Sequence, residues 1–312
     1  MNDSMQVFDR VLVRKRRERA AKTLPEADFL LRESAGRLAD RLLDVARTFT
    51  LALDLGCHTG QLAAPIKLSK KVETLFQADF SPAMATAANK FSLIPTFCAD
   101  EEFLPIKNGG LDLILSNLSL HWVNDLPGAL AQICRSLKPD GLFLATIFGG
   151  ETLKELRTVL MESEEETIGG IAPRVSPFID VRDSGNLLSR AGFSLPVVDT
   201  ENIEVTYENI FKLMADLRAM AETNAILQRS RIPIRRSTLM RAAELYQEKF
   251  SDHRGRIIAT FQIVNLTAWS PHESQQKPMR PGTAKTTLAE ALSTEEIILN
   301  DKTPFSKKIT TT

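Results

Sequence analysis

The chain has 312 residues, of which 43% are hydrophobic, and its 39 Lys and Arg residues balance 39 Asp and Glu residues. A net charge of zero argues against a general nucleic-acid binder, which needs a basic field. The three cysteines form no CxxC pair, which argues against a disulfide framework or a structural zinc site. No apolar run could span a membrane, and neither a signal peptide nor an acid-poor transit peptide is evident, so we expect a cytoplasmic, bacterial protein.

The chain starts with two segments of helical spacing, residues 5–22 and 26–47. The second places apolar side chains on one side, as an amphipathic helix does. The first carries a dense basic cluster, which we interpret as a solvated helix face; contact with an acidic partner or an anionic membrane surface is the alternative. This cluster consists of Arg10, Arg14, Lys15, Arg16, Arg17 and Arg19.

Strands and helices then alternate. The apolar runs predict strands at 51–56, 72–79, 94–100, 111–117 and 142–148, separated by helices at 60–70, 81–90 and 125–137 and by a turn at 138–141. Ser81 and Pro82 are a typical helix start. Continuous apolar strands that alternate with helices predict an α/β fold with a doubly wound, mostly parallel, Rossmann-like sheet. Such sheets bind ligands at the carboxyl ends of their strands.

The pattern loosens after residue 150. It predicts a helix at 184–193, strands at 195–206 and 256–267, and mostly helical sequence between these two strands. The polar tail is expected to be partly disordered. We therefore expect an N-terminal helical cap (1–48), a Rossmann-like core (49–206), a helical insertion that forms a substrate lid (207–255), a last strand with a C-terminal extension (256–285) and a disordered tail (286–312).

Three acids follow three successive strands. Asp54 precedes the turn Gly56–Gly60, in which backbone amides can approach a ligand closely. Asp79 can accept hydrogen bonds from both hydroxyls of a ribose, and either Asp100 or its neighbour Glu101 can accept one from an adenine amino group. The turn lacks the GxGxxG spacing of a dinucleotide site. Asp54 suits an ammonium group instead, so the constellation indicates S-adenosylmethionine.

At this point the stretch "LDLGCHTG" resembles the first motif of the class I methyltransferase family, DxGxGxG. "ADFSPAM" (78–84), "ADEEFLPI" (99–106), "LDLILSNLSLHW" (111–122) and "ICRSLKPDGLFL" (133–144) resemble its later motifs, so the resemblance covers about residues 50–148. The resemblance implies a seven-stranded sheet and a cap over the site formed by residues 5–22. One departure stands out, because His58 replaces the middle glycine, at a position that favours an unusual backbone dihedral.

Further candidate residues complete the predicted site. Asn117 ends the fourth strand, where it can reach the methionine end of the ligand or simply cap the strand. His121 is a candidate general base, although packing is the commoner role of such a histidine. The cofactor-binding set is Asp54, Gly56, Cys57, His58, Gly60, Asp79, Phe80, Asp100, Glu101 and Asn117, with Phe8, Arg10 and Trp122 expected at the substrate or in the lid. No metal site is expected, since the ligand spacing is missing.

Segments outside these motifs carry a closer resemblance. "VFDR" (7–10), "FGGETLKELR" (148–157), "SPFIDVRDSGNLLSRAGF" (176–193) and "LMADLRAM" (213–220) are similar to the mitochondrial complex I assembly factors of methyltransferase fold, the fifth in their numbered series, and to their bacterial relatives. The resemblance implies hydroxylation of an arginine on a complex I subunit. "SNLSLHW" and "LKPDG" also resemble the biotin-pathway enzymes that methylate a malonyl group on an acidic carrier protein. A cofactor-binding chaperone without catalysis is the third hypothesis.

Overall fold

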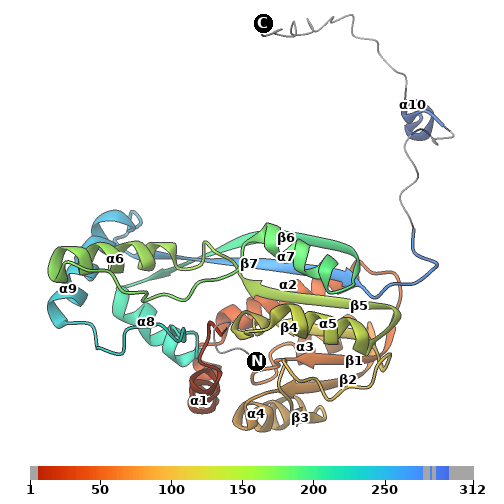
Figure 1. Ribbon diagram of the computed structural model, residues 1–312, viewed down its shortest axis with the longest axis horizontal. Coiled ribbons are helices and arrows are strands. Elements are labelled where there is room, and N and C mark those ends of the chain that lie inside the picture. Colours follow the sequence, from red (N-terminus) through yellow and green to blue (C-terminus); the bar gives the residue numbers. More distant parts are fainter. Residues whose placement is uncertain (1–5, 277–281, 283–285, 295–312) are drawn as a thin grey trace, which may run out of the picture. The chain divides into compact units, whose positions relative to one another are not determined.

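The computed structural model describes residues 6–276, 282 and 286–294. Residues up to Glu273 belong to one unit, and residues from Ser274 onward belong to a second, described separately below. Within the first unit, seven strands form one sheet in the order β3-β2-β1-β4-β5-β7-β6 (Figure 1). β1 to β5 run parallel, and β7 is antiparallel to both of its neighbours. This mostly parallel, seven-stranded sheet confirms the predicted fold class.

The strands are β1 (Phe49–Leu55), β2 (Val72–Asp79), β3 (Thr96–Cys98), β4 (Leu111–Asn117), β5 (Leu137–Phe148), β6 (Ser194–Tyr207) and β7 (Ile257–Trp269). The helices of the first unit are α1 (Arg10–Ala20), α2 (Phe29–Leu43), α3 (Ala63–Ser69), α4 (Pro82–Ser92), α5 (Leu126–Ser136), α6 (Lys154–Ile168), α7 (Val181–Arg190), α8 (Ile210–Ala219) and α9 (Arg236–Lys249). Two short 3-10 helices, η2 (Leu24–Glu26) and η3 (Leu120–Trp122), lie between them.

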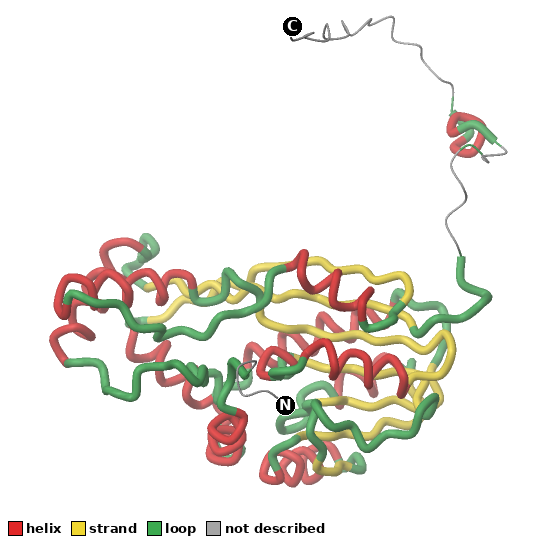
Figure 2. The backbone as a smooth tube through the Cα atoms, viewed as in Figure 1, coloured by secondary structure: helices red, strands yellow, loops and turns green. Residues whose placement is uncertain are grey.

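Helices cover both faces of the parallel sheet (Figure 2). Leu38 of α2 packs with Leu113 and Leu115 of β4, whereas Ile133 of α5 packs with Ile114. Successive residues of β4 thus face opposite layers, as a strand buried on both faces requires. The chain leaves β1 toward β2 on one side and reaches β4 on the other, so the carboxyl ends of β1 and β4 flank the topological switch point.

Residues 138–141, predicted as a turn, are part of β5 in the structure. The sequence KPDG carries three turn-forming residues, Pro139, Asp140 and Gly141, and Asp140 does adopt a positive φ of 61°. The pairing between β4 and β5 shifts its register between Leu111 and Leu113, so the extra residues are absorbed by an irregularity in the ladder. The prediction of a turn was therefore wrong in its extent.

A second core lies beyond the parallel sheet, around the long strands β6 and β7 (Figure 1). α6, α8 and α9 share this core with Leu24, Leu30 and Leu31 from the N-terminal segment. α8 and α9 are the predicted helical insertion before the last strand. α6 was not predicted. The domain boundaries given above stay predictions.

The second unit contains one short helix among its described residues, α10 (Leu288–Leu292), with a capping box formed by Thr287 and Glu290. The tail predicted to be disordered, residues 286–312, includes this helix, and its residues 295–312 lie outside the described residues. Of the helices that the structure describes, none is both long and apolar enough to cross a membrane.

Candidate functional site

The turn after β1 holds the glycine-rich motif in a left-handed backbone. Gly56 has φ 73° and Gly60 has φ 94°, which glycine adopts without strain. His58 has φ 50°, so it takes up the conformation that the expected glycine would provide. The amides of Gly56 and Cys57 donate to the carbonyl of Ala78 at 2.8 and 2.9 Å, which fixes the turn to the end of β2.

Gly56 has no room for a side chain. A Cβ there would lie 2.1 Å from Ser119 Oγ, which cannot move freely because it hydrogen-bonds Arg17 and Glu101. Gly56→Ala is therefore expected to lower the free energy of unfolding by about 3 kcal/mol or more. Gly169→Ala is the matched control, since Gly169 also has φ 73° but faces open space; about 1 kcal/mol is expected there. Urea unfolding measures both, and equal losses would contradict the close packing at Gly56.

The His58 side chain points across the turn to the end of β4. Its Nε2 lies 3.2 Å from the carbonyl oxygen of Asn117 and 3.0 Å from that of Leu118, so it donates to this pair. Burial, together with the positive charge of Arg17, lowers the pKa of His58 to about 3, so the ring is neutral. The Asn117 side chain donates to the carbonyl of Leu31 and accepts from Thr146, and thus has partners of its own.

Asp54 has a carboxylate oxygen without a partner. The residue is fully buried, and its Oδ2 accepts a hydrogen bond of 3.0 Å from Gln77. Its buried Oδ1 accepts none from the described residues. Burial is the main cause that raises the pKa of Asp54 to about 7. Such an orphaned acceptor is rare in a native protein unless it serves a ligand.

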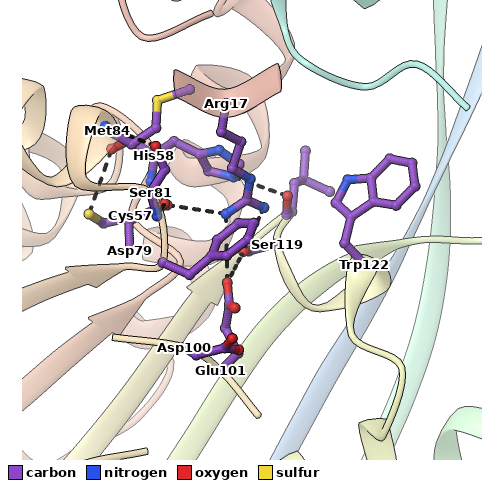
Figure 3. Close-up of polar contacts among 12 residues, drawn as sticks. Arg17, Cys57, His58, Asp79, Ser81, Met84, Asp100, Glu101, Ser119 and Trp122 are labelled. Atoms are coloured by element: carbon purple, nitrogen blue, oxygen red, sulfur yellow. Dashed lines mark hydrogen bonds and ion pairs between the residues drawn. The ribbon is translucent and has the colours of Figure 1, made fainter. Parts of the chain in front are cut away.

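Asp79 is occupied by an arginine that was not predicted to lie here. Its Oδ1 accepts from the amide of Ser81 at 2.8 Å, and its Oδ2 accepts from the amide of His58 at 3.1 Å and from Arg17 Nη1 at 3.2 Å (Figure 3). Arg17 is only 1% exposed and also donates to Ser119 Oγ at 2.9 Å. Burial raises the pKa of Asp79 to about 6, against the opposing effect of Arg17.

Arg10 occupies the acids after β3 in the same way. It pairs with Asp100 and donates to Glu101 Oε2 at 2.7 Å. Burial opposes ionisation of Glu101, but Arg10 and Arg17 together lower its pKa below the ordinary range. Both guanidinium groups lie over the Phe80 ring, at 4.3 and 4.9 Å from its centroid. The basic cluster is thus only partly a solvated face, because α1 inserts Arg10 and Arg17 at the strand ends.

His121 and Trp122 meet an unpredicted partner, Glu222. Glu222 Oε2 accepts from Trp122 Nε1 and lies within hydrogen-bond distance of His121 Nε2, at 3.0 Å in both cases. Trp122 also packs edge-on against Phe8, with their centroids 5.3 Å apart. The His121 ring contacts Phe148 and makes no hydrogen bond to the three strand-end acids. Its catalytic role stays a prediction.

The structure brings together the predicted cofactor-binding residues at the carboxyl ends of β1, β2 and β4 and just after β3. Phe8 and Trp122 share an apolar cluster with Phe80, and Arg10 contacts Glu101. Three residues were missed: Arg17, Ser119 and Glu222. Across the described ranges, no group of three or more His, Cys, Asp or Glu residues is placed to hold a metal ion. The site offers carboxylates and backbone amides, which suit a ligand that bears hydroxyl, amino and ammonium groups.

A family model described as "Methyltransferase domain" matches residues 53–145. Among solved structures, the YcgJ protein from Bacillus subtilis aligns with a TM-score of 0.53 at 14% identity, covering 76% of this chain and 99% of that one. At this identity the likeness concerns the fold alone. The family model and the 34%-identical methyltransferase relative reported below define the class of the protein: the chain belongs to the S-adenosylmethionine-dependent methyltransferase superfamily, and its sheet has the class I fold.

The sequence relatives are more specific. The chain is 45% identical to "Arginine-hydroxylase NDUFAF5, mitochondrial" from Danio rerio, over 92% of this chain and 89% of the relative. The human protein of that name is 44% identical, over 92% and 84%. "Malonyl-[acyl-carrier protein] O-methyltransferase" from a Methylovorus species is 34% identical, over 85% and 90%. The chain belongs to the family of the arginine hydroxylase NDUFAF5.

One prediction from the sequence is overturned by these relatives. We expected a cytoplasmic protein, whereas the NDUFAF5 relatives are named as mitochondrial. The predicted cytoplasmic location is therefore contradicted. These relatives come from animals and from Dictyostelium discoideum, so they do not support the expected bacterial source.

Proposed function

We propose that the chain binds S-adenosylmethionine at the ends of β1 to β4 and modifies an arginine side chain of a protein, a subunit of respiratory complex I. The observation that carries the cofactor is the orphaned Oδ1 of Asp54 beside a glycine turn. The substrate is supported by the relatives named as arginine hydroxylases, which match almost the whole chain.

The residues present fit this cofactor. Asp54 Oδ1 is an unused acceptor for its ammonium group. Asp79 and Asp100 are the acceptors for the ribose hydroxyls and the adenine amino group, once Arg17 and Arg10 release them. When bound, the cofactor would supply an electrophilic methyl group for methyl transfer; hydroxylation of the arginine would instead need an oxidant that this cofactor does not supply.

The chain's own residues have three tasks in this proposal. The strand-end acids orient the ligand, the neutral His58 ring holds the end of β4 in place, and Trp122 with Phe8 closes the apolar side of the site. Excluding water and aligning the reacting groups are the contributions that such a site makes to rate.

The test is peptide mass spectrometry of complex I subunits from source cells with and without this chain. We expect one arginine-containing peptide to lose the mass of one oxygen in the deletion, and to regain it with the wild-type chain. Loss of a methyl mass would assign methyl transfer instead. If no arginine changes although cofactor binds, the modification is wrong and a chaperone role is favoured.

A second candidate is methylation of a carboxylate on an acidic carrier protein. It is supported by the malonyl carrier-protein methyltransferase relatives at 34% identity and by the basic residues Arg14, Lys15 and Arg19 on the outer side of α1. If the substrate is this carboxylate, deletion of the chain leaves every arginine unchanged and abolishes the methyl ester on the carrier protein.

A further inference from the structure

A cavity of about 480 Å³ lies beside the strand-end site, between α1, α6, α8 and the segments 171–180 and 220–235. Its walls are mostly apolar, with contributions from Leu12, Leu156, Leu160, Phe178 and Leu217. Arg16 and Arg17 are neighbours on α1, yet Arg16 lines this cavity while Arg17 binds Asp79. Consecutive residues of α1 thus reach the cavity and the strand-end site.

The cavity has a single carboxylate among its lining residues, that of Glu222, a residue of intermediate burial. The Glu222 side chain is 8% exposed, and its Oε2 is used by His121 and Trp122. Its Oε1 accepts no hydrogen bond from the part of the chain that the structure describes. Burial opposes ionisation, but His121 and Arg17 lower the pKa of Glu222, so the group is a carboxylate. A buried, ionised carboxylate with an unused oxygen suits a cationic donor.

The outer lining of the cavity has the opposite charge. Arg218 and Arg231 are exposed, and neither has an ion pair among the described residues. Arg16 is flanked by Arg19 and Arg229, whose charges add to burial in lowering its pKa. Arg16 and Arg218 also line a second, adjoining cavity of about 720 Å³. The mouth is therefore positive and under-compensated, while the buried carboxylate inside is negative.

We propose that this cavity receives the side chain of an arginine that is flanked by acidic residues. The guanidinium donates to Glu222 Oε1, the methylene stem lies along the apolar walls, and the acidic neighbours pair with Arg218 and Arg231. This inference rests on the proposed function, because it names the sequence context of the arginine that the protein modifies. Glu222 is the residue that selects a cation over the carboxylate of the alternative substrate.

The test measures binding of a capped synthetic peptide with one arginine between two pairs of glutamates, by calorimetry, on the full chain with S-adenosylmethionine present. The matched peptide carries citrulline, which has the same shape without the charge. Glu222→Gln keeps an acceptor oxygen for His121 and Trp122. It is expected to weaken binding of the arginine peptide about tenfold or more, because a charge-assisted hydrogen bond is lost. Glu73→Gln, at an exposed position on β2, is the control and should change nothing.

A second variant does not depend on a buried position. Arg218→Ala combined with Arg231→Ala is expected to weaken binding of the arginine peptide several-fold and to reduce the salt dependence of that binding, since two exposed charges are lost. The inference is overturned if Glu222→Gln binds the arginine peptide as wild type does, if citrulline binds equally well, or if Glu222→Gln strengthens binding, as an anionic substrate predicts.

The outcomes separate this inference from the proposed function. Peptide binding that depends on Glu222, with no modified arginine in cells, supports the recognition site and contradicts the modification. A modified arginine in cells, with binding indifferent to Glu222, supports the modification and contradicts this site.

Discussion

Arg17→Met is expected to lower the free energy of unfolding by about 3–5 kcal/mol, the range found when one partner of a buried ion pair is removed. Among the described residues, Arg17 is the only arginine paired with Asp79; its Nη1 lies 3.2 Å from Asp79 Oδ2 and 3.6 Å from Glu101 Oε1. Methionine fills a similar volume but leaves two buried carboxylates with less compensation. Urea unfolding at pH 8, where both carboxylates are ionised, measures the loss.

Arg14→Met is the control for this substitution. Arg14 lies one turn earlier on α1 and is 55% exposed, and its one ion-pair partner among the described residues is Glu18 at the surface. Its loss is expected to stay below about 0.5 kcal/mol. If both variants unfold alike, the contacts between Arg17 and the strand-end acids contribute nothing to stability, and the closed arrangement of α1 is wrong.

Asp79→Asn is expected to weaken the binding of S-adenosylmethionine about a hundredfold, because two hydrogen bonds from ribose hydroxyls to a charged acceptor become hydrogen bonds to a neutral one. Asparagine keeps one oxygen, which can accept from the amide of His58 or from that of Ser81 but not from both, because these amides donate to different oxygens of Asp79. Calorimetric titration of the full chain with the cofactor measures the change.

Asp112→Asn is the matched control, since Asp112 lies at the opposite end of the sheet, where it accepts from the amide of Leu51 and pairs with Lys138. Its cofactor affinity should equal that of the wild type. An Asp79→Asn variant with unchanged affinity would remove the strand-end acids from the cofactor site and would contradict the proposed binding mode.

The parallel half of the fold was predictable because its signals are local. The bounds of β2 and β4 match the predicted 72–79 and 111–117, where continuous apolar runs end at Asp79 and Asn117. α6 was missed because its buried face is partly polar. Glu155 and Glu164 both face the interior, where Glu155 accepts from Thr260 and Glu164 pairs with Arg174. An apolar stripe is therefore interrupted in the sequence.

The site likewise has one part that local sequence signals predict and one part that depends on the folded chain. Its acids follow strands, and their position at the sheet edge comes from topology alone. Arg17 could not be distinguished from its basic neighbours on α1, because only the packing of the helix decides which of them is buried. Glu222 lies 100 residues from Trp122 in a segment without regular periodicity, and only the folded chain brings the two side chains together.

The arginines of α1 have a consequence for how quickly and how tightly a ligand can bind. A ligand that takes Asp79 and Asp100 binds only those molecules in which Arg17 and Arg10 have withdrawn. Its apparent dissociation constant is then the intrinsic one divided by the open fraction, so an open population of about 1% weakens binding about a hundredfold. In such a scheme the observed association rate stops rising with ligand concentration once it reaches the rate at which α1 opens.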